Sequence, residues 1–376
     1  MTTHEAAPAA MPSAARVIGV DAARGLALIG MFVAHVAPMV EDPTSAALIG
    51  IADERPRLLF ALTAGIGLGF ISGGVRPIPT TDPAARGILR RQIAIRAVIL
   101  IALGLLIAAT LHPLVFIILD VYGVAFLLML PLLFLPPRAA LMVGIGLLAI
   151  TPALAEIAAR TPFVAEARQG AFRIPVDWAV SGAYPVIVWV PVMLIGLALA
   201  RLDLASRSTV FVAGLVGVAV ACIMLPLSTL PPQPQIVADA AWSVPLRASL
   251  ETLGNTGVAV AVVAVLLVLT GLAAPAVRRA SITITSPVAA MGSMPLSIYT
   301  LHLVVIALAI RVEPETGVVT DDSWPLLIGL VVGSMLFAWL WRHFIGRGPL
   351  EWLLRWASGR SRVARAPSDT TANGRS

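Results

Sequence analysis

The sequence predicts an all-α protein, a bundle of about ten helices that cross a membrane, with both termini in the cytoplasm. Three observations indicate this fold. Of the 376 residues, 59% are hydrophobic and only 12% are charged, with a mean hydropathy of +0.93, and this composition excludes a soluble globular domain. Apolar stretches of spanning length recur between short polar breaks, and arginine is concentrated in alternate breaks. Together these features predict a multi-pass protein of the plasma membrane.

The expected spans follow one another with little chain between them. Each is dominated by apolar side chains over roughly the 17 to 25 residues that are needed to cross the hydrocarbon layer. They are expected at residues 17–40, 56–73, 93–111, 115–136, 139–158, 184–201, 208–229, 254–276, 291–311 and 324–345. The third and fourth are the least distinct pair, because Leu111-His112-Pro113 is the only break between them.

The two ends of the chain differ from this membrane domain of residues 17–345. Residues 1–16 are rich in Ala, Pro and Ser, which predicts a disordered cytoplasmic N-terminus. They lack the basic start of a signal peptide, so the first span is expected to be retained. Residues 346–376 are expected to form a short interfacial helix, with Trp352 and Trp356 at the headgroup level, and then a basic, disordered cytoplasmic tail.

The charge of the chain is explained by its topology. It has no lysine, and the net charge of +6 comes from 26 arginines against 20 acidic residues. With the N-terminus inside, 19 arginines fall in cytoplasmic segments and 7 in outside segments, as the positive-inside rule requires. No nucleic-acid partner is therefore expected. The single cysteine, Cys222, cannot form an internal disulfide, and no Cys or His spacing indicates a metal site.

The first span carries three ionisable residues on one face. An α-helix turns about 100° per residue, so the eleven steps from Arg24 to His35 return to within roughly 20° of the same direction. Asp21, three residues before Arg24, lies on that side too. Such groups are costly in lipid and indicate a functional site. The alternatives are a core histidine bonded to a neighbouring helix and an Asp21–Arg24 ion pair that anchors the helix.

Other spans hold further candidates, each with a structural alternative. His302 and Tyr299 share a face near mid-membrane, at a depth within about 10 Å of His35. They either border a cavity with His35 or pack in the core. The arginines that precede the third span either set topology or attract a polyanionic donor: Arg86, Arg90, Arg91 and Arg96. The Gly-x-x-x-Gly spacing of residues 65–69 predicts a close helix-packing face rather than a nucleotide site.

Several motifs resemble two related groups of membrane acyltransferases. Asp21-x-x-Arg24-Gly25 with His35 is similar to the first span of the heparan-α-glucosaminide N-acetyltransferase family and of the acyltransferase-3 family, in which an arginine and a histidine at this spacing are essential. The first group is the closer relative, because its resemblance continues downstream. The further matching segments are Arg57–Gly69, Asp120–Phe126, Gly182–Pro185 with Trp189, Gly196–Arg201, Leu296–His302 and Gly346–Trp352. In the animal enzyme the catalytic histidine follows the first span, but residues 41–55 contain none, which leaves His35.

This resemblance implies an acyltransferase that uses acetyl-CoA from the cytoplasm as co-substrate, without a metal. The acceptor is a hydroxyl or amine of a sugar or lipid at the membrane or the outer face. The residues assigned on this basis are His35, Arg24, Asp21 and His302 for catalysis, Arg24, Arg90 and Arg91 for the donor, and Asp120, Tyr122 and Tyr299 for substrate. His35 either removes the acceptor's proton or carries the acyl group. Two alternative functions are a transporter or flippase and a non-catalytic scaffold; the acceptor, the acyl length and the oligomeric state are left open.

Overall fold

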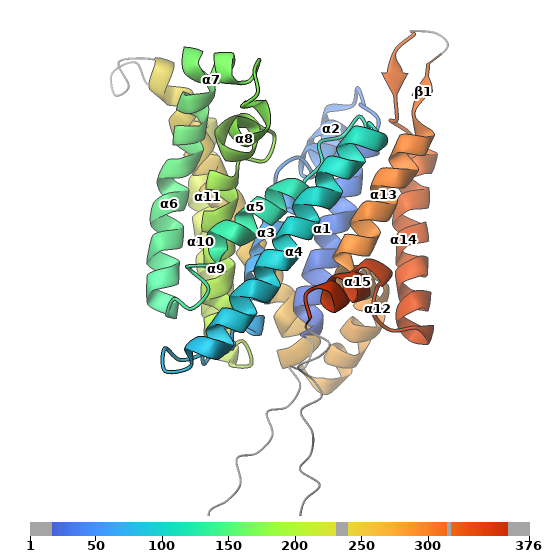
Figure 1. The fold of residues 1–376 in the computed structure, drawn as a ribbon. Helices are drawn as coiled ribbons and strands as arrows, with labels where there is room; N and C mark the ends of the chain where they lie inside the picture. The colour runs from blue at the N-terminus through green and yellow to red at the C-terminus, as the bar shows by residue number, and fades with distance from the viewer. Residues whose placement is uncertain (1–16, 231–239, 314–316, 360–376) are drawn as a thin grey trace, which may run out of the picture.

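Helices dominate the structure, a computed structural model that describes residues 17–230, 240–313 and 317–359 (Figure 1). Within these ranges the strands are β1 (Arg311–Val312) and β2 (Val319–Thr320), which pair antiparallel. The disorder predicted for residues 1–16 and for the end of the tail lies outside the described residues. The all-α membrane bundle expected from the sequence is confirmed.

The helices follow the expected spans in order. Their bounds are α1 (Ile18–Val36), α2 (Pro43–Gly50), α3 (Arg55–Ile71), α4 (Pro83–Thr110), α5 (Leu119–Met129), α6 (Pro137–Ala159), α7 (Pro162–Ala167), α8 (Arg173–Val176), η1 (Asp177–Ser181), α9 (Val186–Arg201), α10 (Arg207–Thr229), α11 (Ala240–Leu267), η2 (Val268–Leu272), α12 (Pro275–Ser293), α13 (Pro295–Ala309), α14 (Trp324–Phe344) and α15 (Pro349–Ala357). Each of the ten predicted stretches overlaps one of these helices, although several helices extend beyond the predicted bounds.

Fewer than ten of these helices are long enough to cross a membrane unaided. Six described helices have the length and composition to do so, and two bent pairs raise the number to eight: α8 and η1 with α9, and α12 with α13. Helix α3 has 17 residues, at the lower limit of the spanning length, and α5 has 11, well below it. Ten spans and cytoplasmic termini therefore stay predictions.

Helix α12 was not expected from the sequence. It contains Arg278 and Arg279 together with several Ser and Thr residues, so no long apolar run marks it. It meets α13 at a bend of 80°, where Pro295 begins α13 and cannot continue the hydrogen-bond ladder of α12. The bend sets the direction of α13, the helix that carries His302.

Glycines allow three pairs of helices to approach closely. A Cβ on Gly292 of α12 would lie 1.7 Å from the carbonyl oxygen of Asp21, and one on Gly25 of α1 would lie 2.0 Å from that of Val288. The same closeness joins α3 to α9 and α10 to α11; the glycines there are Gly65, Gly196, Gly217 and Gly257. The close-packing prediction for residues 65–69 is thereby confirmed. Larger side chains would separate α1 from α12 and α3 from α9.

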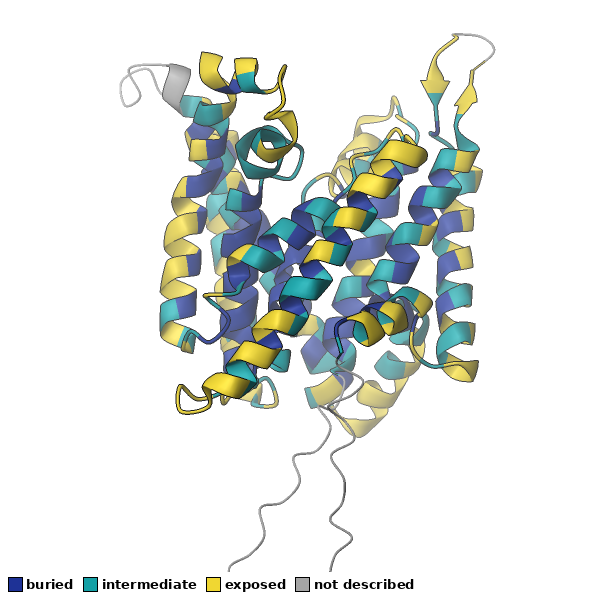
Figure 2. Cartoon of the chain, in the orientation of Figure 1, coloured by how far each residue is buried: buried dark blue, intermediate teal, exposed yellow. Residues whose placement is uncertain are grey.

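The centre of the bundle is apolar, and its outward faces are exposed. Almost every residue of α9 is buried, and Figure 2 shows exposed residues along the outward sides of α6 and α14. Arg201, at the end of α9, is the exception in composition: it is 2% exposed and donates to the carbonyl oxygens of Gly69, Gly74 and Leu133. Arg201 therefore holds the adjacent loops in place, a role that is not apparent from its inclusion among the 19 cytoplasmic arginines.

A short helix forms at the predicted place after residue 346. In α15, Trp352 and Trp356 are exposed, as an interfacial position requires. On its other side the carboxylate of Glu351 accepts from the backbone N–H groups of Leu296 (2.7 Å) and Ser297 (3.1 Å) and from the Ser297 hydroxyl. These are the unpaired donors at the start of α13, where a negative charge is favourable. Glu351 thus attaches α15 to the bundle.

Candidate functional site

Two histidines from distant parts of the chain meet inside the bundle. The Nδ1 atom of His35, in the last turn of α1, lies 3.2 Å from Nε2 of His302 on α13. Their rings are stacked, with centroids 5.4 Å apart and planes 13° from parallel. His302 is fully buried, with the rings of Phe32 and Tyr299 beside it at 5.0 Å and 4.6 Å. His35 and His302 are therefore in contact, but His302 does not line the cavity that His35 borders, so a cavity shared by the two histidines, which we predicted, is not observed in the part of the chain that the structure describes.

The contact between the rings limits where their protons lie. One hydrogen occupies the space between the two nitrogens, so one ring donates and the other accepts. When Nδ1 of His35 donates to His302, Nε2 of His35 keeps its lone pair. Among the described residues none forms a hydrogen bond with this nitrogen. That tautomer makes Nε2 a base or a nucleophile, whereas the opposite tautomer makes it a donor.

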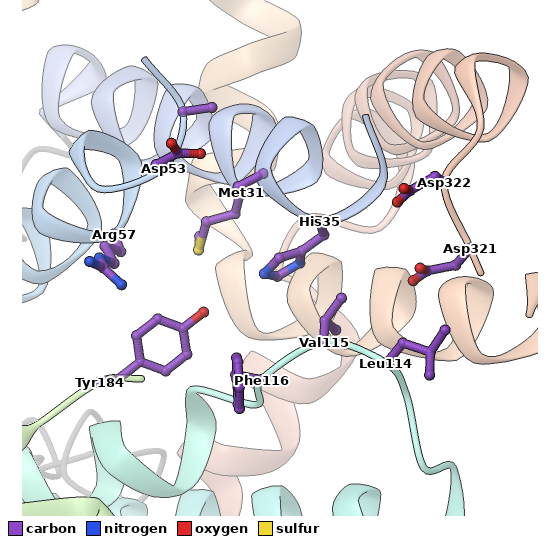
Figure 3. Close-up of a pocket in the computed structure, with 12 residues that line it drawn as sticks. Met31, His35, Asp53, Arg57, Leu114, Val115, Phe116, Tyr184, Asp321 and Asp322 are labelled. Atoms are coloured by element: carbon purple, nitrogen blue, oxygen red, sulfur yellow. The ribbon is translucent and has the colours of Figure 1, made fainter. Parts of the chain in front are cut away.

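His35 borders a cavity of about 370 Å³ at the end of α1, here called the His35 cavity (Figure 3). Its lining residues are Met31, Ala34, His35, Ala52, Asp53, Arg57, Leu114, Val115, Phe116, Tyr184, Asp321 and Asp322. The three carboxylates outnumber the single cation, Arg57. That arginine also pairs with Glu54 and donates to the carbonyl oxygen of Ala183 at 3.2 Å. The cavity is therefore acidic.

A second cavity, here called the arginine cavity, lies around the other end of α1. Its volume is about 480 Å³. Four arginines line it against two carboxylates, those of Asp21 and Glu351; the arginines are Arg24, Arg96, Arg347 and Arg355. Its remaining walls are largely apolar and aromatic, with Phe60, Phe126 and Tyr122 among them. This cavity is positively charged at its polar end.

Tyr122 and Tyr299, both assigned to substrate from the sequence, line the arginine cavity. The Tyr122 hydroxyl is buried and has no hydrogen-bond partner among the described residues, so it is available to a bound group. The Tyr299 hydroxyl accepts from the backbone N–H of Ile118 at 3.0 Å. Because the Tyr299 ring also touches His302, the contacts run from the arginine cavity through Tyr299 and His302 to His35.

Arg24 and Asp21 line the arginine cavity but also hold helices together. The Arg24 guanidinium donates to the carbonyl oxygens of Thr63 on α3 (2.9 Å) and Gly292 on α12 (3.2 Å). It lies 3.5 Å from the Asp21 carboxylate. Both interpretations made from the sequence therefore have a geometric basis: the pair anchors α1, and Arg24 adds charge to the cavity wall.

Three other residues assigned from the sequence line neither cavity. Arg90 donates to the carbonyl oxygen of Leu130 at 3.2 Å, and Arg91 is exposed. The Asp120 carboxylate accepts from the Trp178 indole at 2.8 Å, which joins α5 to η1. The residues found in their place are Arg96, Arg347, Arg355 and Asp321. Arg96 belongs to the group of arginines noted before the third predicted span. Arg347 and Arg355 were predicted only as part of the basic segment after residue 346, and Asp321 was not predicted as a site residue.

Comparison with known proteins identifies the family. A model described as the heparan-alpha-glucosaminide N-acetyltransferase catalytic family matches residues 16–224, more than half of the chain. A second model, described as a protein of unknown function (DUF418), matches residues 199–361 and so includes His302. No curated protein matches the sequence. Within the described residues no group of His, Cys, Asp and Glu is placed to hold a metal ion. The chain belongs to the heparan-alpha-glucosaminide N-acetyltransferase catalytic family, and it is related to membrane acetyltransferases.

Proposed function

We propose that this protein is an integral-membrane acyltransferase. It moves an acyl group, an acetyl group by family, from a cytoplasmic acyl-CoA to a hydroxyl or amine of a sugar or lipid at the membrane or outer face. The observation that supports this most directly is the pair of oppositely charged cavities at the two ends of α1, with the His35–His302 contact between them.

The arginine cavity suits the donor. Coenzyme A is a polyanion at its nucleotide end and a long, nearly uncharged arm at its thiol end. The guanidinium groups of Arg96, Arg347 and Arg355 provide planar pairs of donors for phosphate oxygens. The aromatic walls that lead toward Tyr299 provide a surface for the arm. In this arrangement the thioester points toward His302 and His35.

The spacing between Arg24 and His35, which resembles that of acyltransferase-3 proteins, then has a geometric explanation. Eleven residues of helix separate the two side chains by about 16 Å along α1, and they line different cavities. Arg24 adds positive charge at the donor end of the helix, and His35 acts at the acceptor end. With the arginine cavity in the cytoplasm, both termini are cytoplasmic, as the arginine distribution predicts.

His35 carries the chemistry in either of two ways. As a base, Nε2 takes the proton of the acceptor hydroxyl or amine while the acceptor attacks the thioester carbonyl; the carbon–sulfur bond breaks, and the proton passes to the thiolate. As a nucleophile, Nε2 attacks the thioester carbonyl and the carbon–sulfur bond breaks, which releases the thiolate; the acceptor then attacks the acyl group on His35, the bond between that group and Nε2 breaks, and the acceptor's proton passes to the thiolate. Both routes need the tautomer in which His35 donates through Nδ1 to His302. His302 is therefore the residue that positions His35.

The test uses the purified protein in lipid nanodiscs. We expect coenzyme A to bind, measured by calorimetry, and acetyl-CoA to be consumed with transfer of labelled acetyl. Mass spectrometry of envelope glycans and lipids from a deletion strain identifies the acceptor as the molecule that loses one acyl mass. Absence of coenzyme A binding, together with an unchanged envelope and measurable solute flux through proteoliposomes, contradicts the proposal and supports the transporter alternative.

A further inference from the structure

The loop between β2 and α14 brings a buried carboxylate into the His35 cavity. Asp321 is 5% exposed and lines this cavity (Figure 3). Its Oδ2 atom has no hydrogen-bond partner among the described residues. Buried carboxylates in proteins are normally hydrogen-bonded or paired, because an uncompensated charge is costly away from water. The unsatisfied oxygen therefore needs a physical explanation.

The loop is held in place beside His35 by backbone and side-chain contacts. The N–H of Ser323 donates to the carbonyl oxygen of Val36, the residue after His35, at 2.9 Å. The Ser323 hydroxyl accepts from the N–H of Leu326 and so caps α14. Arg311 donates at 2.6 Å to the carbonyl oxygen of Asp322 rather than to the Asp321 carboxylate. Asp321 is thus fixed near the catalytic histidine by groups that leave its Oδ2 free.

The other carboxylates of the cavity are less suited to hold a ligand. Asp53 is exposed and Asp322 is half-buried, so water screens both charges. Asp321 lies outside the spans, and burial raises the pKa of its carboxyl above the ordinary value. Its own backbone N–H opposes this rise in pKa, Asp322 adds to it and Arg311 opposes it. These effects describe a carboxylate that lacks a strong partner among the described residues.

We propose that Asp321 binds the acceptor: its free oxygen receives a hydrogen bond from a hydroxyl or ammonium group of the acceptor and aligns that molecule beside Nε2 of His35. This inference rests on the proposed function, because only a transfer reaction needs an acceptor at that place. It deepens that function by assigning an acceptor-binding residue. Asp321 was not among the candidates taken from the sequence.

The experiment compares Asp321→Asn with the control Glu41→Gln, both as full-length protein in nanodiscs; Glu41 is exposed and lines neither cavity. The donor is acetyl-CoA, and the probe acceptors are methyl β-glucoside, which offers hydroxyls, and methyl β-glucosaminide, which adds an amine. For Asp321→Asn we expect the acceptor KM to rise about 10- to 100-fold, as for the loss of one hydrogen bond to a charged group. The KM for acetyl-CoA stays within about twofold, and Glu41→Gln behaves like the wild type.

Thermal unfolding distinguishes a ligand-binding role of Asp321 from a structural role. Removing an unpaired buried charge without changing shape leaves the Tm of Asp321→Asn unchanged or higher. A lowered Tm with equal losses for donor and acceptor overturns the proposal, because Asp321 is then structural. Equal acceptor KM values for the Asp321→Asn and Glu41→Gln variants also overturn it. A larger rise in KM for methyl β-glucosaminide indicates that Asp321 binds an ammonium group, and a larger rise for methyl β-glucoside indicates that it binds a hydroxyl.

Failure of the proposed function gives a different result. In that case the wild type neither binds coenzyme A nor acetylates either probe. Calorimetric titration of the two sugars into wild type and Asp321→Asn then decides about Asp321 alone. Weaker binding to the variant supports an Asp321 ligand site, and equal or absent binding overturns it.

Discussion

The two cavities along α1 differ in charge, in size and in the segments that complete them. The His35 cavity, about 370 Å³, is lined by Asp53, Asp321 and Asp322 with one arginine, whereas the arginine cavity, about 480 Å³, is lined by four arginines. A polyanion is attracted to one and repelled by the other. In the proposed reaction this difference directs the donor and the acceptor to opposite ends of α1, and the two react at His35, in the last turn of the helix.

The segments that close the cavities both come from the last third of the chain. The loop before α14 closes the His35 cavity, and α15 closes the arginine cavity. Helix α13 lies between them and brings His302 to His35. Each cavity can therefore be altered separately, and the following predictions use this separation, from the largest expected effect to the smallest.

Replacing His35 removes the proposed catalytic group. His35 borders the His35 cavity, and its contact with His302 and Tyr299 connects it to the arginine cavity. We expect His35→Ala to lower the transfer rate by about 10²- to 10⁴-fold, the range for loss of a general base, while coenzyme A binding to the arginine cavity is retained. The measurement is single-turnover transfer of labelled acetyl, with calorimetry for binding. His343→Ala is the control, since His343 lines neither cavity. Near-normal turnover of His35→Ala contradicts a catalytic role.

Neutralising Arg347, which precedes α15, together with Arg355 of α15 changes residues that line the arginine cavity and not the His35 cavity. Both lie outside the spans, and burial and then the neighbouring Arg347 lower the pKa of Arg355. We expect Arg347→Gln with Arg355→Gln to weaken coenzyme A binding about 10- to 100-fold, without changing the acceptor KM. Arg91→Gln, on the exposed face of α4, is the matched control. Equal effects of the two changes refute the donor assignment.

Replacing His302 tests the connection between the cavities. His302→Gln loses the ring that fixes the His35 tautomer, and we expect kcat to fall about tenfold with both KM values unchanged, a loss near 1.4 kcal/mol. A double-mutant cycle with His35→Ala measures the coupling. Additive effects, or full activity with a lowered Tm, assign His302 to the scaffold.

Arg24→Lys distinguishes the role of Arg24 in joining helices from its proposed role in binding the phosphates of the donor. Lysine keeps the charge but cannot bridge the carbonyl oxygens of Thr63 and Gly292, which the Arg24 guanidinium does. We expect a stability loss of about 1–3 kcal/mol from these contacts and a donor KM that rises by less than about tenfold. Thermal unfolding and acetyl-CoA kinetics give the two numbers. An unchanged Tm with a large rise in donor KM indicates that Arg24 serves mainly as a phosphate clamp.

Acidification distinguishes the cavities without a mutation. Burial raises the pKa of Asp321, so its carboxylate becomes protonated at a higher pH than an ordinary aspartate as the pH falls. Because the folded pKa exceeds the unfolded one, Asp321 destabilises the fold fully above its folded pKa; this cost falls as the pH drops through that pKa and is gone below the ordinary pKa of an unfolded aspartate. The acceptor KM is expected to rise about tenfold per unit below that pKa, and Asp321→Asn removes this dependence. The groups that also face the cavity or the loop are His35, Asp53, Arg57, Arg311 and Asp322.

The sequence by itself determined most of the long helices, though not α12, and one face of the site. Hydropathy located a helix in each of the ten stretches, and glycine spacing in residues 65–69 identified a packing face, because both depend on neighbours in the chain. Helical periodicity placed Asp21, Arg24 and His35 on one stripe of α1. The charge and the amphipathic pattern of the residues after 346 also predicted the short helix α15.

Only the tertiary structure decided which residues meet. His302 reaches His35 because α12 and α13 bend by 80° and because Gly25 and Gly292 let α12 approach α1. Asp321 enters the cavity because Ser323 bonds to Val36, about 290 residues away in sequence, a contact with no local signal. Arg90, Arg91 and Asp120, which were assigned to donor or substrate from the sequence, line neither cavity for the same reason. Residue type and position along the chain do not give the direction of a side chain between packed helices, which backbone separations of a few ångströms control.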